Sequence, residues 1–206
     1  MSDEMIHPTA LIEADVEIGA GSQIWDHVHI RQGARIGHNC IVGEKTYIAG
    51  QVQIGNHVKV NACVYICPLV TIEDLVMISA HTVFTNDKLP RAFAPDLSGL
   101  ATSAVTEETL PTVVRRGATI GANATIACGI EIGRFAMIGM GSVVTRSVAD
   151  HALVVGNPAR QRGYVCVCGQ PLGAALRFEQ GPAACDRCRR RYSLAGGRVI
   201  ETSLVA

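Results

Sequence analysis

Four cysteines towards the C-terminal end of the sequence have the type and spacing of metal ligands. They form two close pairs, Cys166-Val-Cys168 and Cys185-Asp-Arg-Cys188, with sixteen residues between the pairs. Zinc held tetrahedrally by four thiolates is a closed structural site, and a segment this short cannot bury a sufficient core without one. The first pair has a single intervening residue, where zinc ribbons usually have two. We expect a zinc ribbon; disulfides, reduced free thiols and a redox role are the alternatives.

A second group of polar side chains surrounds the string Val83-Phe84-Thr85-Asn86-Asp87-Lys88-Leu89-Pro90-Arg91-Ala92. The imidazole of His81 has the right ordinary pKa to take up a proton near neutral pH, but it is equally well a surface histidine without a catalytic duty. The fork-shaped guanidinium of Arg91, with Lys88 beside it, suits a diphosphate; solvated loop charges are the alternative. Taken alone, Asn86 is best explained as a turn residue.

These groups are positioned by a repeat in which every sixth residue is aliphatic or Phe. The repeat runs from Ile6 to Phe84 and returns from Val114 to Val144. A period of six fits neither an α-helix nor the simple alternation of a flat strand. It fits short strands that each turn two side chains inward before a corner, as in parallel β-helices. The sequence therefore predicts an all-β fold.

Three such hexads close one triangular coil, so residues eighteen apart stack in columns. The repeat amounts to six or seven coils and a prism roughly 30 Å tall. One outward column contains Trp25, Gly43, Asn61 and Ser79, and another contains His27, Lys45, Cys63 and His81. An outward tryptophan on a solid prism indicates a subunit contact or a stacking platform.

The repeat lapses from 87 to 112, so we expect an excursion that leaves the prism at a corner and returns to the next coil. Loops this long on an economical scaffold usually carry function. We expect the segment Asp150-His151-Ala152-Leu153-Val154-Val155-Gly156-Asn157-Pro158-Ala159-Arg160 to leave the prism. The predicted organisation is a β-helix domain over 1–163 and a zinc-ribbon-like module over 164–206.

The hexads, of the form [Ile/Val]-Gly-x-x-[Ala/Val/Ser/Thr]-x, resemble those of the left-handed β-helix acyltransferases. The string from Val83 to Ala92 resembles the Phe-Thr-Asn segment of N-acetyltransferases that act on nucleotide-linked 3-amino sugars. Their acceptors are dTDP-3-amino-3,6-dideoxyhexoses or UDP-2-acetamido-3-amino-2,3-dideoxyglucuronate. Three further matches follow in chain order: Ile24-Trp25-x-x-Val28-His29-Ile30, Gly121-Ala122-Asn123-Ala124-Thr125-Ile126 and Gly156-Asn157-Pro158-Ala159-Arg160. The likeness covers roughly residues 6 to 163.

This resemblance implies a left-handed coil, a homotrimer, and an acetyl-CoA donor in the groove between subunits. It also implies that Asn86 lies beside the sugar amine, where its oxygen can accept an amine hydrogen and point the lone pair at the thioester. His81 is the competing acid or base. The substrate-binding candidates are Trp25, Asn61, Lys88 and Arg91. The candidates for the CoA phosphates and the donor groove are Arg115, Arg116, Asn157 and Arg160.

Composition limits the other partners. The formal net charge is zero, which gives no electrostatic case for nucleic acid or an acidic membrane surface. The start, Met1-Ser2-Asp3-Glu4, does not resemble a signal peptide, and no stretch approaches the ~20 apolar residues of a membrane span. We expect a cytoplasmic protein.

Other functions on the same scaffold stay open. One is an O-acyltransferase, or a serine- or tetrahydrodipicolinate-type acyltransferase. Another is a non-catalytic scaffold or a γ-carbonic-anhydrase-like metal site. A carbonic-anhydrase-like site needs three converging histidines. The columns instead place His27 and His81 three coils apart, a separation of about 14 Å.

Overall fold

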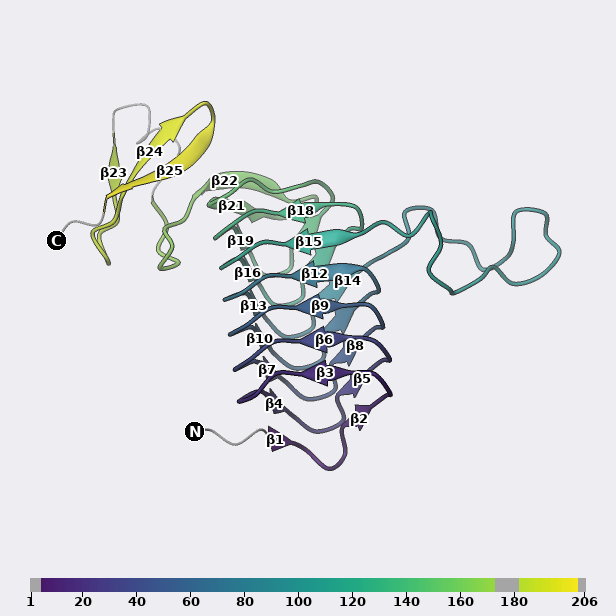
Figure 1. The fold of residues 1–206 in the computed structure, drawn as a ribbon. Helices are drawn as coiled ribbons and strands as arrows, with labels where there is room; N and C mark the ends of the chain where they lie inside the picture. Colours follow the sequence, from purple (N-terminus) through teal and green to yellow (C-terminus); the bar gives the residue numbers. More distant parts are fainter. Residues whose placement is uncertain (1–4, 173–181, 204–206) are drawn as a thin grey trace.

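The computed structural model describes residues 5–172 and 182–203, and those ranges contain strands and loops but no helix. Most of the chain forms a three-sided parallel β-helix, and a small antiparallel sheet lies beside its C-terminal end (Figure 1). This confirms the expected all-β class and the left-handed parallel β-helix. Within the described ranges nothing has the length and apolar character of a membrane-crossing helix.

Three sheets form the three sides of the β-helix. Sheet A contains β1 (Met5–Ile6), β4 (Gln23–Ile24), β7 (Ile41–Val42), β10 (Lys59–Val60), β13 (Met77–Ile78), β16 (Thr119–Ile120), β19 (Met137–Ile138), β21 (Ala152–Val155) and β22 (Arg160–Tyr164). Sheet B contains β2 (Leu11–Ile12), β5 (His29–Ile30), β8 (Tyr47–Ile48), β11 (Tyr65–Ile66), β14 (Val83–Phe84), β17 (Thr125–Ile126) and β20 (Val143–Val144). Sheet C contains β3 (Glu17–Ile18), β6 (Arg35–Ile36), β9 (Gln53–Ile54), β12 (Val70–Ile72), β15 (Thr112–Val114) and β18 (Glu131–Ile132).

The expected column arithmetic holds in the strand register. Residues eighteen apart pair across neighbouring coils, as Tyr47 does with Tyr65. Beyond the excursion Val83 pairs with Thr125. That separation is 125 − 83 = 42 residues, so the excursion inserts 42 − 18 = 24 residues without disturbing the columns.

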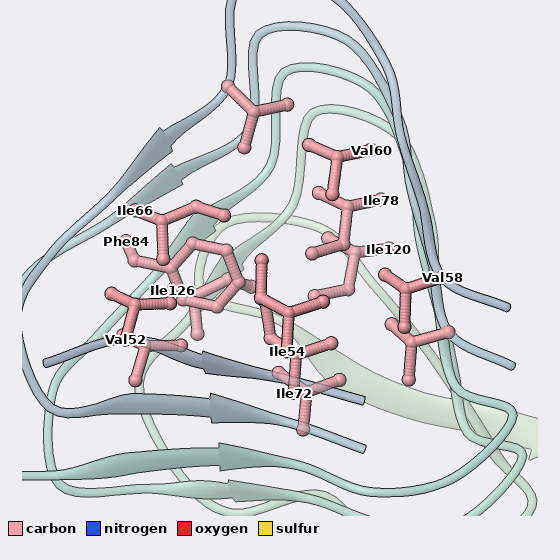
Figure 2. Close-up of a cluster of buried hydrophobic side chains, with 14 of the residues drawn as sticks. Val52, Ile54, Val58, Val60, Ile66, Ile72, Ile78, Phe84, Ile120 and Ile126 are labelled. Atoms are coloured by element: carbon pink, nitrogen blue, oxygen red, sulfur yellow. The ribbon is translucent and has the colours of Figure 1, made fainter. Parts of the chain in front are cut away.

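The interior is filled by the aliphatic residue of each strand. Val60, Ile78 and Ile120 form one such stack, and all three are 0% exposed (Figure 2). Phe84 is the largest inward side chain of its column and is also buried. Close packing of this kind makes the removal of even one methylene costly, so each coil depends on its neighbours.

One corner between sheets A and B is a column of left-handed residues. It contains His27, Lys45, Cys63, His81 and Asn123, with φ between 53° and 59°. A non-glycine residue in this conformation costs about 1–2 kcal/mol. Hydrogen bonds between coils offset that cost, because Cys63 N donates to Glu44 O at 2.8 Å and His81 N donates to Ala62 O at 3.0 Å.

The C-terminal end of the prism differs from the expectation. The segment that begins at Asp150 does not leave the β-helix at once, because β21 pairs with β19 and extends sheet A by one strand. The partners Ile138 and Val154 are only 154 − 138 = 16 residues apart, so this strand falls outside the period of six. β22 then returns antiparallel to β21.

The excursion projects sideways from the prism as an extended loop between β14 and β15 (Figure 1). The strand register is regained at Thr112, two residues before the expected Val114. Leu110 N donates to Asn86 O at 3.4 Å and closes the base of the loop. Three of its side chains are strongly exposed leucines: Leu89, Leu97 and Leu100.

The C-terminal sheet consists of β23 (Ala183–Ala184), β24 (Arg191–Ala195) and β25 (Arg198–Ser203), all antiparallel. Its small core is centred on Tyr192, which is 0% exposed. The predicted domain boundary after Gly163 falls inside β22, and the division into two domains stays a prediction.

Two adjacent residues of β9 test which side chains of the repeat point into the prism and which point to solvent. Ile54→Ala removes a side chain that is 5% exposed, and we expect it to lower the free energy of unfolding by about 2–5 kcal/mol. The neighbouring Gln53→Ala changes an exposed side chain, and we expect a change within about 0.5 kcal/mol. Denaturant unfolding measures both, and equal effects would contradict the assignment.

Candidate active site and candidate metal centre

The two candidate catalytic residues flank the same strand but lie at different corners. His81 belongs to the corner that precedes β14, and Asn86 belongs to the corner that follows it. The outward face of sheet B therefore separates them within one chain. The excursion leaves the prism after β14 (Figure 1), and the hydrogen bond from Leu110 N to Asn86 O puts Asn86 at its base.

Asn86 does not have the features of a turn asparagine. Its φ is not positive, and its half-buried side-chain amide makes no hydrogen bond within the described part of the chain. Asp87 takes the turn role instead, because its carboxylate accepts a hydrogen bond from Leu89 N at 2.9 Å. The Asn86 backbone is held by Leu110, while its amide is left available to a ligand.

His81 presents an exposed imidazole from a strained corner. Its φ is 59°, and only its backbone is hydrogen-bonded, to Ala62. Among the described residues no carboxylate contacts its ring. Catalytic histidines are normally oriented by a second group, and the described part of one chain does not supply one here.

Trp25 and Asn61 occupy the same A-to-B corner as His81. Trp25 is 42% exposed, as expected for an outward aromatic, and its backbone N donates to Val42 O. Asn61 is half-buried; its backbone carbonyl accepts a hydrogen bond from Thr46 Oγ1 at 3.0 Å, and its side-chain amide has no partner among the described residues. This corner thus presents a ring, an amide and an imidazole, each on a different coil.

The cationic candidates fall into two groups. Lys88 and Arg91 are exposed on the excursion, and Arg91 donates only to the adjacent Pro90 carbonyl. Arg115 instead bridges Glu73 at 2.8 Å and Glu131 at 2.7 Å. Its hydrogen bond holds the pKa of Glu131 below the ordinary value. Arg115 is therefore neutralised within the chain, whereas Arg91 has no carboxylate partner among the described residues.

The other candidates for the donor groove lie elsewhere. Arg116 is 3.3 Å from the Asp74 carboxylate and lines a polar hollow of about 380 Å³ at the corner between sheets C and A. This hollow is also lined by His38, Asn56, His57, Asp74 and Leu75. Asn157 is exposed in the turn between β21 and β22, and Arg160 is exposed at the start of β22. None of these three lies on the Asn86 corner.

A cluster on the outward face of sheet B was missed at the level of sequence. Glu13 contacts His29 Nε2 at 2.8 Å and Arg31 Nε at 2.6 Å, and Arg31 Nη1 donates to Tyr47 OH at 3.0 Å. The hydrogen bond from Arg31, assisted by Gln32 N and His29, lowers the pKa of Glu13 to about 2. Tyr47 and Tyr65 stack with ring centroids 5.0 Å apart. The signal was present, because His29, Tyr47 and Tyr65 are spaced by eighteen residues.

The four C-terminal cysteines converge. Their Sγ atoms all lie within 4.8 Å of one another, with Cys166 3.3 Å from Cys188 and Cys168 3.6 Å from Cys185. Tetrahedral zinc with Zn–S bonds near 2.3 Å places sulfurs about 3.8 Å apart, so the cluster fits this ion. All four thiols are free, and the sulfurs are too far apart for disulfide bonds.

The short spacing of the first cysteine pair is accommodated by its turn. Gly169 has φ 84°, and its N–H donates to Cys166 O at 2.8 Å, which closes a tight knuckle. In the second knuckle Arg189 N donates to Cys185 O at 2.9 Å. Among the described residues this is the one group of three or more His, Cys, Asp or Glu with metal-binding geometry. A three-histidine site of the carbonic-anhydrase kind is therefore not formed by the described part of one chain.

The comparisons with known proteins agree with the fold. A family model described as bacterial transferase hexapeptide (six repeats) matches residues 15–50, 33–68 and 111–146. The chain is 49% identical over 90 residues to a dTDP-3-amino-3,6-dideoxy-alpha-D-galactopyranose 3-N-acetyltransferase of Aneurinibacillus thermoaerophilus. That match covers 44% of this chain and 44% of the relative, so the chain spans less than half the relative's length.

Two solved structures share the architecture. One is a hexapeptide-repeat acetyltransferase of Vibrio cholerae O1 biovar eltor complexed with acetyl coenzyme A, with a TM-score of 0.52 and 26% identity. The match covers 64% of this chain and 70% of that one. The other is a putative acetyltransferase of Bacillus cereus, with a TM-score of 0.51, 20% identity, and coverage of 77% of this chain and 80% of that one. Over residues 15–68 and 111–146 the repeats and the three-sided coil are similar to those of the hexapeptide-repeat bacterial transferases.

Proposed function

We propose that the protein is an acetyl-CoA-dependent N-acetyltransferase that acts on the amino group of a nucleotide-linked 3-amino sugar. The observation that carries this proposal is the 49% identity over 90 residues to an enzyme named for that reaction. The Asn86 amide at the base of the excursion supports it. Among the described residues this amide has no hydrogen-bond partner, so it is available to a substrate.

In the proposed reaction the sugar amine attacks the thioester carbonyl carbon, the C–S bond breaks, and CoA leaves as its thiolate. Asn86 Oδ1 accepts one amine hydrogen and so directs the nitrogen lone pair at the carbonyl. Orientation of this kind accounts for several kcal/mol of a barrier. An amide is a poor base, so the amine proton passes to His81, to water or to the departing thiolate.

We propose that the active form is a homotrimer, because one chain leaves apolar surface uncovered. The outward face of sheet B exposes Leu11, Tyr65 and Val83, and the excursion exposes Leu89, Leu97 and Leu100. Exposed apolar surface of this kind marks a contact face. A neighbouring subunit at this face would also bring a His81 corner and an Asn86 corner together, which one chain does not do.

The remaining roles follow from charge and position. Arg91 and Lys88 bind the diphosphate, and Trp25 with Asn61 lines the acceptor groove. Arg116, Asn157 and Arg160 contact the donor, whereas Arg115 serves structure more than CoA because two carboxylates already hold it. These co-substrates place the reaction in the cytoplasm, with no nucleic acid or membrane partner.

We propose that the four cysteines hold one structural zinc ion. The site would supply no chemistry to acetyl transfer, because four thiolates close the coordination sphere. The alternatives for the chain as a whole are acyl transfer to another small acceptor and a non-catalytic scaffold. A scaffold would give no thiol release with any amino sugar.

The role of Asn86 is tested with thiol release from acetyl-CoA in the presence of a panel of nucleotide 3-amino sugars. We expect Asn86→Ala to lower kcat about 100-fold, since the amine loses its orientation. Asn86→Asp keeps an acceptor oxygen and should retain more activity than the alanine variant. Full turnover by Asn86→Ala would contradict the positioning role.

His81→Ala serves as the companion measurement. A loss of about 10²–10⁴-fold in kcat would identify His81 as the proton acceptor. Unchanged turnover would assign the proton to water or to the CoA thiolate.

Arg91 and Arg115 form a matched pair of test substitutions, because of the two only Arg91 is assigned to the nucleotide. We expect Arg91→Ala to raise KM for the nucleotide sugar about 10- to 100-fold with unchanged thermal stability, because a charge-assisted hydrogen bond contributes about 1.5–3 kcal/mol. Arg115→Ala should lower the melting temperature with little effect on that KM, since its partners are Glu73 and Glu131. Steady-state kinetics and thermal unfolding measure both, and the reverse pattern would overturn the assignment.

The metal proposal is tested by elemental analysis of the purified full-length chain. We expect about one zinc per chain, since four thiolates fill a tetrahedral site. Cys188→Ser and a chain truncated after Gly163 should each contain none. Full-length protein without metal under reducing conditions would contradict the zinc site.

A further inference from the structure

We propose that Tyr192 is a positioning residue of the four-cysteine metal centre, and that through it the bound metal fastens the C-terminal module to the last coils of the β-helix. This inference rests on the proposed metal site and is independent of the proposed acetyl transfer. It gives the module a role, namely to hold the C-terminal end of the prism together.

The Tyr192 hydroxyl faces a metal ligand. The side chain is 0% exposed, and its oxygen lies 3.0 Å from Cys166 Sγ. Val167 N donates to the same oxygen at 3.1 Å. Because the backbone N–H occupies an acceptor position of the hydroxyl, its own hydrogen is free to point at the Cys166 sulfur. With a metal bound, that sulfur is a thiolate, and the hydrogen bond becomes a charge-assisted one.

The ring of Tyr192 faces the prism. It packs edge-on against His151 at a centroid distance of 5.5 Å, and His151 stacks on Phe135 at 5.4 Å. His151 and Phe135 are left-handed corner residues, with φ 59° and 53°. One continuous row of rings therefore links the cysteine cluster to a corner of the last coils.

The backbone reinforces this link at the start of the first knuckle. Val165 N donates to His151 O at 2.7 Å, and His151 Nδ1 lies 3.0 Å from Val165 O. A carbonyl can only accept, so Nδ1 carries the ring hydrogen of this buried histidine. Both backbone groups of Val165, the residue before Cys166, are therefore hydrogen-bonded to His151.

The first knuckle also lies along the flank of the prism. Cys166 to Gly169 and the corners of successive coils together line a hollow of about 290 Å³. The prism residues around it are Leu75, Gly117, Thr119, Phe135 and Met137. The second knuckle, with Cys185 and Cys188, belongs to the antiparallel sheet. A metal held by both knuckles therefore joins a prism-bound segment to the sheet that carries Tyr192.

The energetic consequence follows from the linear architecture. In a stack of repeats each coil is stabilised by its neighbours, and the terminal coils loosen first when an end is uncovered. Release of the metal is therefore expected to loosen β19, β21 and β22 before the coils near the other end. The middle of the prism should be unaffected.

Tyr192→Phe tests the positioning role, because it keeps the ring against His151 and removes only the hydroxyl. Groups that hydrogen-bond to metal ligands typically contribute about 10- to 100-fold in metal affinity, and we expect a loss of that size. Affinity is measured by competition with a chromophoric chelator, using the full-length chain loaded with zinc. The matched control is Tyr65→Phe, which removes an outward hydroxyl of sheet B and should leave the affinity unchanged.

A spectroscopic readout separates positioning from general destabilisation. With Co²⁺ in place of zinc, we expect the thiolate-to-metal charge-transfer bands of Tyr192→Phe to shift, with a circular dichroism spectrum unchanged from that of the original chain. Unchanged bands together with unchanged affinity would overturn the role of Tyr192.

Hydrogen exchange tests the fastening. In the metal-free chain, prepared with a chelator or as Cys188→Ser, we expect faster amide exchange in 137–165 and unchanged exchange in 23–66. Equal protection with and without metal, or a uniform loss across all coils, would overturn the proposal. Neither readout involves turnover, so failure here is distinguishable from failure of the proposed acetyl transfer.

Discussion

The hydrogen bonds between successive coils determine the arrangement of everything else. Each coil offers its backbone N–H groups to the carbonyls of a neighbouring coil, as Cys63 N does to Glu44 O and His81 N does to Ala62 O. Because the aliphatic residue of each strand is buried on the inner face, a slip by one residue would turn it towards solvent, so the register is strongly specified. It holds the left-handed corners in a conformation that their side chains would otherwise disfavour. The candidate site is therefore a consequence of column positions, and the excursion is added to a register that it does not alter.

The same ladder explains why so much of the fold could be predicted. A period of six is rare in other architectures, and the aliphatic positions such as Val60 and Ile78 are buried as expected. Columns eighteen residues apart put Trp25 outside and His81 at a corner without any knowledge of coordinates. The last strand of the prism could not be predicted in this way, since β21 pairs at a spacing of sixteen residues. There the packing of Val154 overrides the repeat.

The hydrogen bonds and ion pairs of side chains were harder to predict from the sequence than the positions of the backbone. The columns place Arg115 on the surface, but they do not reveal that Glu73 and Glu131, one coil below and one coil above, both bind it. Nor does spacing reveal that Asn86 lacks the hydrogen bonds of a turn residue while the adjacent Asp87 has them. Such facts depend on rotamers and on which of several neighbours is closest. They distinguish Arg115, which bridges two neighbouring coils, from Arg91, which has no carboxylate partner among the described residues.

The two ends of the prism differ in how well the last inward side chains are covered, and this difference bears on the role of the C-terminal sheet. At the N-terminal end Ile6 occupies an inward position of the repeat and is nevertheless 43% exposed. At the other end Ile138 and Val154 are buried, because β22 and the buried His151 cover the last coil. A linear stack is only as stable as its open ends allow. The C-terminal sheet, whose cysteine sulfurs converge and which contacts the last coil through a row of rings, gives that end a neighbour that further coils of the same repeat would otherwise provide.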